Sequence, residues 1–206
     1  MKQQSFAAAV ACGIASLAYL APAQSASLGY IDGYYIPSAE FEISEGGASA
    51  DDDGDGFGVK GRARFADQLF FTGEYQAVEL DDSELEIDQL RAGVGFTSAV
   101  NPALNLIGRA EFIQVELDGP FLDSDDESGF GIHGGAEAML TPQFMVHGSV
   151  GFISIDDADG PEFLVGLRFL ANESVSIFAD YRVTRLSDSG NDLDLDDLRI
   201  GAGFSF

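Results

Sequence analysis

The most constraining feature of this sequence is a strict two-residue alternation between apolar and polar side chains. Successive side chains of a β-strand point to opposite faces, so this period predicts strands with two unlike faces rather than helices. The clearest case is the last segment, where one face carries Leu198, Ile200, Ala202, Phe204 and Phe206 and the other carries Arg199, Gly201, Gly203 and Ser205.

The alternation recurs along the chain and predicts ten strands. We place them at residues 29–43, 57–65, 69–79, 86–97, 104–116, 129–140, 144–155, 162–170, 175–186 and 198–206. No stretch after residue 26 has the eighteen consecutive apolar residues that are typical of a transmembrane helix.

The connections between the predicted strands are of two kinds that alternate along the chain. Four are short and nearly neutral, at 66–68, 98–103, 141–143 and 171–174. Five are acidic, at 45–56, 79–88, 116–128, 156–162 and 188–197, and together they hold 26 of the 35 acidic residues and no lysine or arginine. Short turns at one end and longer polar loops at the other are typical of a transmembrane β-barrel.

The placement of charge favours a membrane barrel over a soluble β-sandwich, whose strands also alternate. The formal net charge of −25 excludes a nucleic-acid-binding protein, which needs a basic face. In a soluble sandwich the polar strand face meets water, and it would share the acidity of the chain. Instead the polar strand face carries most of the basic residues, while the other face is apolar and suited to lipid. The basic residues on the polar face are Lys60, Arg62, Arg64, Arg91, Arg109, Arg168, Arg182 and Arg199. We therefore predict an all-β, transmembrane, antiparallel up-and-down barrel whose polar face lines the lumen.

The first 26 residues have the layout of a secretory signal peptide. Lys2 is followed by an uncharged apolar stretch from Phe6 to Leu20, and small residues permit cleavage after Ala23 or Ala26. The alternative is an uncleaved membrane anchor. Cleavage would remove the single cysteine and leave the barrel domain at residues 27–206 without thiol chemistry.

The chain resembles the small outer-membrane β-barrels of Gram-negative bacteria, the OmpA- and OmpX-like group. The resemblance rests on the whole architecture and most sharply on the last strand, because members of that group end in an aromatic residue preceded by apolar residues at every second position. It implies residence in the outer membrane and recognition of the C-terminal strand by the barrel-assembly machinery. Many members have eight strands, so eight is the alternative to the ten counted here. The positions that match the assembly signal are Leu198, Ile200, Ala202, Phe204 and Phe206.

Clustered aspartates are the candidate metal ligands. Residues 51–56 match the start of an EF-hand loop, but Arg62 occupies the position where that loop needs a bidentate glutamate. We therefore expect at most weak Ca²⁺ or Mg²⁺ binding by Asp51, Asp53 and Asp55, and the same for the second cluster at Asp192, Asp194 and Asp196. No other cofactor is expected.

The segment His147-Gly148-Ser149 carries the only suggestion of catalysis. It resembles the H-x-S-N motif of barrel lipid A deacylases, but Val150 replaces the asparagine. A three-residue turn at 141–143 would place Glu137 opposite His147, and we expect these two side chains to form a structural hydrogen bond. His133 is expected to stand alone in the lumen.

We expect the luminal charges to pair and to fill the barrel rather than open a pore. The turn lengths put Lys60 opposite Glu74 and Glu162 opposite Arg182. The predicted function is structural or surface-interacting: envelope integrity, adhesion, or cation-mediated contact with lipopolysaccharide. A narrow anion-preferring channel is the alternative, and a lipid A-modifying hydrolase comes third. The expected partners are outer-membrane lipid, lipopolysaccharide and the assembly machinery, for a monomeric protein. The predicted luminal network is Lys60, Arg62, Glu74, Arg91, Arg109, Glu111, Glu137, His147, Arg168, Arg182 and Arg199.

Overall fold

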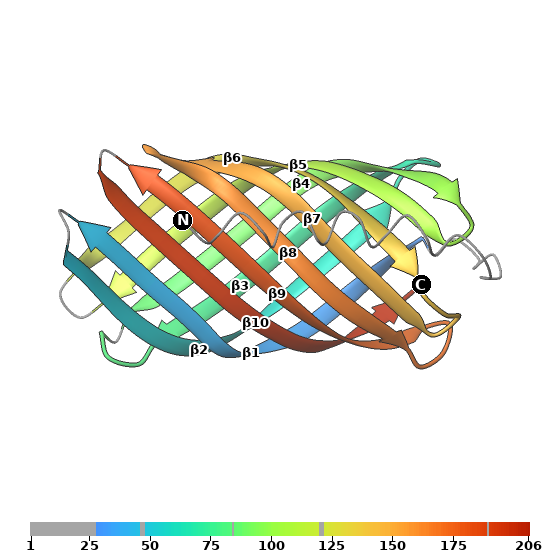
Figure 1. Cartoon of the computed structure of the whole chain (residues 1–206), viewed down its shortest axis with the longest axis horizontal. Coiled ribbons are helices and arrows are strands. Elements are labelled where there is room, and N and C mark those ends of the chain that lie inside the picture. The colour runs from blue at the N-terminus through green and yellow to red at the C-terminus, as the bar shows by residue number, and fades with distance from the viewer. Residues whose placement is uncertain (1–27, 46–47, 84, 120–121, 189) are drawn as a thin grey trace, which may run out of the picture.

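A computed structural model of the chain describes residues 28–45, 48–83, 85–119, 122–188 and 190–206. The predicted signal peptide and its cleavage sites lie outside the described residues. The structure is a closed barrel of ten strands, each antiparallel to both neighbours, with β1 paired to β10 (Figure 1). The strands are β1 Gly29–Glu45, β2 Ala48–Arg64, β3 Leu69–Leu80, β4 Glu86–Asn101, β5 Leu104–Gly119, β6 Leu122–Met139, β7 Phe144–Ile155, β8 Ala158–Leu170, β9 Val175–Asp188 and β10 Asn191–Ser205.

The ten-strand count and the up-and-down topology are as the alternation predicted, and the eight-strand alternative is wrong. In the described part of the chain no helix is long and apolar enough to cross a membrane. The two chain ends of the barrel meet, because the amides of Leu28 and Gly29 donate to the carbonyl oxygen of Phe206 at 2.7 and 3.1 Å.

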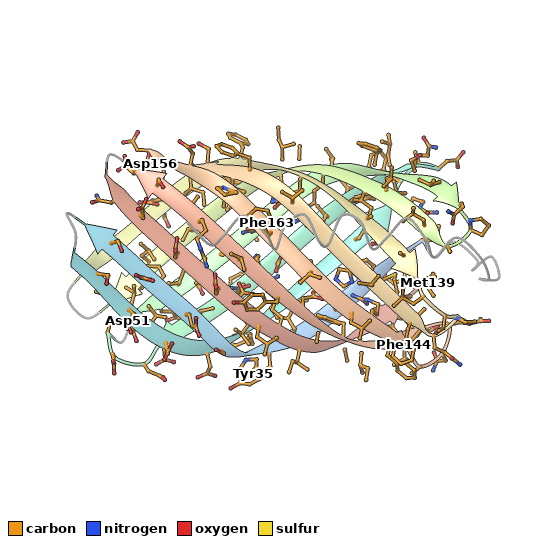
Figure 2. The ribbon with its side chains drawn as sticks, in the orientation of Figure 1. Tyr35, Asp51, Met139, Phe144, Asp156 and Phe163 are labelled. Atoms are coloured by element: carbon orange, nitrogen blue, oxygen red, sulfur yellow. The ribbon has the colours of Figure 1, made fainter. Side chains whose placement is uncertain are left out.

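The prediction of long acidic loops between the strands is wrong. Most of their residues belong to strands, because β2 begins at Ala48, β6 at Leu122 and β10 at Asn191. Aspartate and glycine are poor strand formers, which is why the composition suggested loops, but the ladder of backbone hydrogen bonds continues through them. The acidic residues therefore lie on strand extensions that end in tight hairpins. Figure 2 shows this end of the barrel at Asp51 and Asp156, opposite the end marked by Met139 and Phe144. We call these the acidic end and the short-turn end.

The alternation places apolar side chains on the outer wall. Phe130 and Ile132 on β6 are each 69% exposed. His133, the residue after Ile132, points to the other face and is 3% exposed. One irregularity occurs in β1, where the pairing with both neighbours shifts around Pro37. Proline has no backbone N–H to give to a ladder, so a bulge is accommodated there. As a result Ile36 and Ala39 both point inward and are fully buried.

Candidate functional site

The candidate site is the lumen, where charged side chains from all sides of the barrel meet. Every basic residue predicted to face inward has its side chain on the inner face of its strand. Carboxylates on the same face accompany them, and several were not singled out from the sequence. The inward carboxylates of this region are Asp32, Glu74, Glu111, Glu137, Glu162, Asp180 and Asp197.

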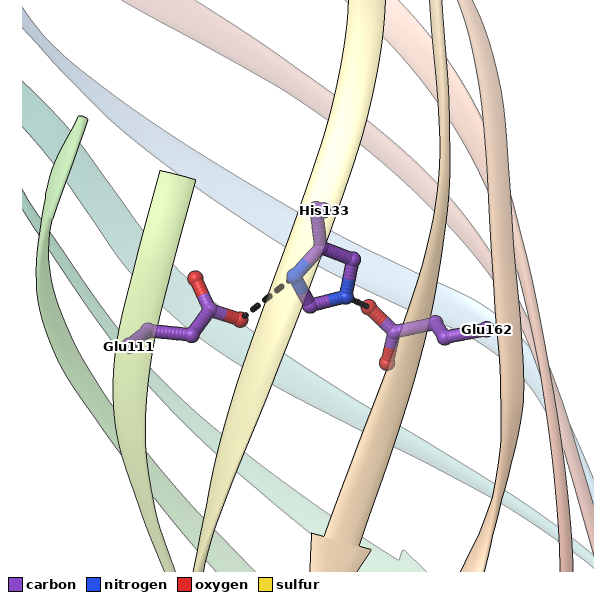
Figure 3. Close-up of side chains that lie close together, drawn as sticks. All are labelled: Glu111, His133 and Glu162. Carbon is purple, nitrogen blue, oxygen red and sulfur yellow. Dashed lines mark hydrogen bonds and ion pairs between the residues drawn. The ribbon is translucent and has the colours of Figure 1, made fainter. Parts of the chain in front are cut away.

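Arg91 is the centre of the first cluster. Its guanidinium donates to Glu162 from Nη1 at 2.9 Å and from Nη2 at 2.6 Å, and Nη1 also donates to Glu111 at 3.1 Å. His133 lies between the same two carboxylates, with Nε2 3.0 Å from Glu162 and Nδ1 3.7 Å from Glu111 (Figure 3). The expectation that His133 stands alone is therefore wrong. Arg109 adds an ion pair to Glu111 at 3.0 Å.

Glu111, His133 and Glu162 are the one group of metal-ligand type whose ligand atoms converge within 4.8 Å among the described residues. All three side chains are buried. The Arg91 guanidinium already supplies a positive charge to both carboxylates. A second cation would meet strong repulsion in this low-dielectric interior, so the cluster is best described as an ion-pair network.

Arg182 and Arg199 form a second cluster around Asp197. Arg182 Nε donates to Asp197 at 2.9 Å, and Arg199 Nε donates to the other oxygen of the same carboxylate. Arg199 also reaches Glu74 at 2.8 Å, and Glu74 accepts a hydrogen bond from the Tyr34 hydroxyl at 2.6 Å. Both arginines are 1% exposed. The two clusters adjoin each other, because Glu74 of the second lies opposite Arg91 of the first in the register of β3 and β4.

Four further pairs lie nearer the short-turn end and join strands that are not neighbours. Asp180 binds both the Lys60 ammonium and His147 Nε2, the latter at 2.9 Å. Arg168 donates to Asp32 at 3.0 Å, and Arg62 donates to Glu137 at 3.0 Å. The guanidinium of Arg62 also lies 5.1 Å from the centre of the Tyr30 ring and 5.0 Å from that of Phe70.

Two predicted pairings are wrong. Glu162 is opposite Thr184 rather than Arg182, because the turn after β8 pairs Leu170 with Ser176 and so sets β9 two residues away from the predicted register. Glu137 is opposite His147 in the register, yet no hydrogen bond joins them in the described structure. Each contacts a different partner across the lumen: Glu137 pairs with Arg62, and His147 contacts Asp180.

Glycines on the inner face make room for these long side chains. A Cβ at Gly151 would collide with the ring of His133, and one at Gly166 would collide with Asp180 and His147. The mixture of glycine and charge that the sequence shows on this face is therefore a packing requirement. Small and large side chains alternate around the lumen to fill it.

Towards the acidic end the lumen is filled by apolar side chains. One cluster includes Ile36, Val78 and Leu80, each at most 2% exposed. A second cluster includes Ile113 and Ile153, which are 0% and 1% exposed. Above the ion-pair layer the barrel interior is thus packed like a protein core, with residues from both sides of the barrel.

Towards the short-turn end the lumen is hollow. A cavity of about 670 Å³ is lined by inward residues of this half of the barrel, including Arg64, Arg109 and Glu137. Its lining reaches the ion-pair layer at Arg91, Glu162 and Arg199 and includes no residue of the apolar clusters. It also includes Gln68, Pro102 and Ala103, which lie at the short turns.

The predicted metal ligands Asp51, Asp53 and Asp55 lie on the outer face of β2, not in a loop. Their neighbour Asp52 points inward and accepts from the Ser83 hydroxyl at 2.6 Å, which holds the pKa of that carboxyl below its ordinary value. Alternate residues on one strand face are about 6.6–6.8 Å apart. The three carboxylates therefore form a row rather than a chelating cluster.

This row continues onto two adjacent strands. The register places Glu40 between Asp53 and Asp196, and Glu42 between Asp51 and Asp194. Directly opposite residues have Cβ atoms only about 4.5–5.5 Å apart, so like charges lie side by side. Arg185 on β9 is the adjoining cation, with ion pairs to Asp194 at 3.1 Å and to Asp196. We call the outward carboxylates of β1, β2 and β10 the acidic wall: Glu40, Glu42, Asp51, Asp53, Asp55, Asp192, Asp194 and Asp196.

Sequence reasoning missed Glu40, Glu42 and the inward acids Asp32, Asp180 and Asp197. A signal was present, because Asp32 and Asp180 are charged residues inside segments predicted to span a membrane. Such residues are costly in hydrocarbon and therefore point to the lumen. Their partners could not be read in the same way, since they lie on distant strands.

The last strand has the predicted arrangement of faces. Ile200, Phe204 and Phe206 are 52–55% exposed on the outer wall, and Arg199 is buried in the lumen. The amide of Phe206 donates to the carbonyl oxygen of Gly29 at 3.0 Å, which adds to the two bonds that its own carbonyl accepts. The terminal residue is therefore part of the seam that closes the barrel.

Comparisons with known proteins agree with this architecture. Residues 5–169 match the family described as outer membrane protein beta-barrel domain. No curated protein matches the sequence.

Several solved structures are similar to this one at low sequence identity. The outer membrane protease OmpT from Escherichia coli is 9% identical, with a TM-score of 0.55 over 93% of this chain and 100% of that one. Neisserial surface protein A is 15% identical, with a TM-score of 0.47 over 89% of this chain and 100% of that one. Ail, the attachment invasion locus protein of Yersinia pestis, is 17% identical, with a TM-score of 0.39 over 86% of this chain and 99% of that one. At these identities the similarity concerns the fold alone.

Proposed function

The chain belongs to the outer membrane protein beta-barrel domain family, and we propose that it serves as a non-conducting barrel that interacts with the cell surface. Its family places it in the bacterial outer membrane. In this proposal the acidic end faces outward and the short-turn end faces the periplasm. The protein acts as a monomer, after assembly through its C-terminal strand.

The observation that carries the proposal is the filled lumen. Buried ion pairs around Arg91 and Arg182 occupy the middle of the lumen, and buried apolar clusters around Ile36 and Ile113 lie between them and the acidic end. An ion crossing the barrel would have to lose its water among these buried aliphatic side chains, which is costly. This supports a structural or surface role over conduction.

The acidic wall supports contact with lipopolysaccharide through divalent cations. Ca²⁺ and Mg²⁺ prefer oxygen ligands, and carboxylates lined up on a strand surface offer many of them without a preformed cage. The lipopolysaccharide leaflet is itself anionic, so cations shared between it and Glu40, Glu42 or Asp53 would relieve repulsion on both sides. Binding of this kind is weak at each ion and spread over the wall.

Conductance is the direct test of the filled lumen. Purified, refolded protein is inserted into planar lipid bilayers and recorded in about 1 M KCl, where charges are screened and even a weakly selective pore conducts. We expect no stable conductance step. A reproducible, anion-selective step would contradict the proposal and favour the narrow channel.

Cation-dependent binding to lipopolysaccharide tests the surface role. Wild-type protein should cosediment with lipopolysaccharide in the presence of Mg²⁺ and be released by a chelator. The double variant Glu40→Gln, Glu42→Gln should bind less, and Glu173→Gln, at the exposed short turn before β9, is the matched control. Equal binding by all three proteins would refute a role for the acidic wall.

We do not propose an enzyme. His147 binds Asp180, and in the described structure no hydrogen bond joins it to Ser149. A general base must reach the proton that it removes, and here the histidine is held in an ion-pair network with Lys60. OmpT is a protease by its name, but the similarity to it concerns the barrel fold.

A further inference from the structure

The cavity at the short-turn end is closed on one side only. It ends at the ion-pair layer and extends to residues of the short turns, so it is a blind chamber rather than part of a channel. Its volume of about 670 Å³ falls within the range of roughly 300–1,000 Å³ that is typical of small-molecule sites. We call it the vestibule.

The vestibule holds cationic groups that are not fully paired with carboxylates. Arg64 lines it at the end of β2, and its guanidinium has no hydrogen bond or ion pair with any other described residue. Arg109 has an ion pair to Glu111, with Nε at 3.0 Å; its terminal amino groups donate no hydrogen bond to another described residue, and its side chain is 25% exposed. By contrast Glu137 is paired with Arg62, and Glu111 and Glu162 are paired with Arg91.

One carboxylate in the lining has no such partner. Asp67 lies on the exposed turn between β2 and β3, at the mouth, where water screens its charge. The interior of the vestibule therefore carries an excess of positive charge, although the whole chain has a formal net charge of −25. Field lines concentrate in such a recess between low-dielectric walls.

The remaining lining supplies hydrogen-bond donors of neutral type. Asn105 and Ser149 line the vestibule from β5 and β7, whereas the Thr72 hydroxyl already donates to the carbonyl oxygen of Gly61 at 3.3 Å. The Arg62 guanidinium is fixed between the rings of Tyr30 and Phe70 and by Glu137, so the wall beside Arg64 is rigid. A site with fixed walls loses little conformational entropy when it binds a ligand.

We propose that the vestibule binds a small organic anion, one that carries a carboxylate or phosphate group, from the side of the short turns. The two oxygens of such a group match the planar donor pairs of a guanidinium. Arg64 and Arg109 contact the anionic group, and the neutral donors contact the rest of the ligand. Because the apolar clusters block the far side, the ligand binds and leaves through the same opening.

Calorimetric titration of the refolded barrel in an uncharged detergent tests this assignment. Citrate and inorganic phosphate serve as separate probes, which distinguishes a carboxylate site from a phosphate site. We expect saturable binding of at least one of them, weakened as the salt concentration rises. Arg64→Gln and Arg109→Gln should each weaken it by about tenfold to a hundredfold, the usual effect of losing a charge-assisted hydrogen bond.

Arg185→Gln is the matched control, because Arg185 lies on the outer wall at the other end of the barrel and should not affect binding. Arg64→Lys keeps the charge and should retain more affinity than Arg64→Gln, which separates loss of charge from a folding defect. The heat-modifiable gel shift of each variant reports its folding. Absence of saturable binding to either probe would overturn the proposal, as would equal weakening by Arg185→Gln.

Discussion

Arg91 on β4 and Glu162 on β8 face each other across the lumen and share two hydrogen bonds, of 2.9 and 2.6 Å, although their strands are not neighbours in the barrel. Both side chains are almost fully buried, at 3% and 1% exposure. The pair therefore links opposite walls of the barrel.

Glu162→Gln should destabilise the barrel strongly, because it leaves the buried Arg91 guanidinium with only one of its two hydrogen-bonded carboxylates, that of Glu111. Breaking a buried pair by removing one partner typically costs about 3–5 kcal/mol. A urea titration of the refolded protein, followed by circular dichroism or the gel shift, measures this loss; tryptophan fluorescence is not an option, since the chain has none. The double variant Arg91→Met, Glu162→Leu should recover part of the loss. A double variant less stable than Glu162→Gln alone would contradict this account of the Arg91–Glu162 pair.

Deletion of Phe206 should impair assembly. The deletion removes three backbone hydrogen bonds to Leu28 and Gly29 at the closing seam and the terminal aromatic side chain on the outer wall. The wild type should show a heat-modifiable shift on gels, and the variant should show a smaller shifted fraction after refolding and in membranes. Phe206→Tyr keeps the backbone and the ring, so it should assemble normally. A deletion variant that folds as fully as the wild type would show that the seam does not depend on its last residue.

Arginine substitutions distinguish the lipid face from the lumen. Ala110 faces outward in the middle of β5, and Ala110→Arg should lower the free energy of unfolding by about 2–4 kcal/mol, the cost of this side chain near the bilayer midplane. Ala136, nearer the short turns on β6, should show the same sign and a smaller loss. Ile107→Arg is the control, because that side chain lines the vestibule, where water and space are available. If Ile107→Arg were the most harmful of the three, the assignment of faces would be wrong.

The sequence predicted which residues share a strand face because that property depends only on the two-residue period. Lys60 and Ile200 were therefore placed on the correct faces of the barrel wall from the sequence. The strand ends were not predictable in this way, because the aspartates of β2 and β10 have low strand propensity and are held in strands by pairing with β1 and, for β10, also with β9.

Partners across the lumen were beyond the reach of this reasoning. Turn lengths fix which residues are opposite on adjacent strands, such as Glu137 and His147. They do not fix the contacts of long side chains that cross the lumen, such as Arg62 with Glu137 or Lys60 with Asp180. Those contacts depend on barrel diameter and strand tilt, which follow from the closed sheet as a whole.

Epitope insertion tests the orientation of the barrel. A tag inserted between Asp156 and Asp157, in the tight hairpin at the acidic end, should be accessible to antibody on intact cells. A tag at Pro102, in the short turn between β4 and β5, should become accessible only after the outer membrane is permeabilised. Both insertions lie between strands, so neither interrupts a ladder. The reverse pattern of labelling would place the acidic end in the periplasm.

The acidic wall should make stability depend on pH and on divalent cations together. Partial burial raises the pKa of Asp194 above its ordinary value; Arg185 opposes this shift, and Glu42 and Asp196 add to it. The folded state therefore holds this proton more tightly than the unfolded chain does. The stabilisation it gives is present below the ordinary carboxyl pKa of about 3.9 and is lost as the pH rises through the higher, folded-state pKa.

Cations should reverse this loss at neutral pH, where the wall is ionised. We expect Ca²⁺ to raise the temperature of the heat-modifiable transition at pH 7 and to have little effect near pH 4, because protonated carboxyls no longer attract it. Asp194→Asn should raise the transition temperature without Ca²⁺ and reduce the increase that Ca²⁺ gives. Asp67→Asn, which changes a carboxylate at the opposite end, should leave the Ca²⁺ effect unchanged. If Ca²⁺ stabilised all three proteins equally at both pH values, it would be acting on detergent or lipid, and the rows formed by Glu40, Glu42 and their neighbours would have no part in it.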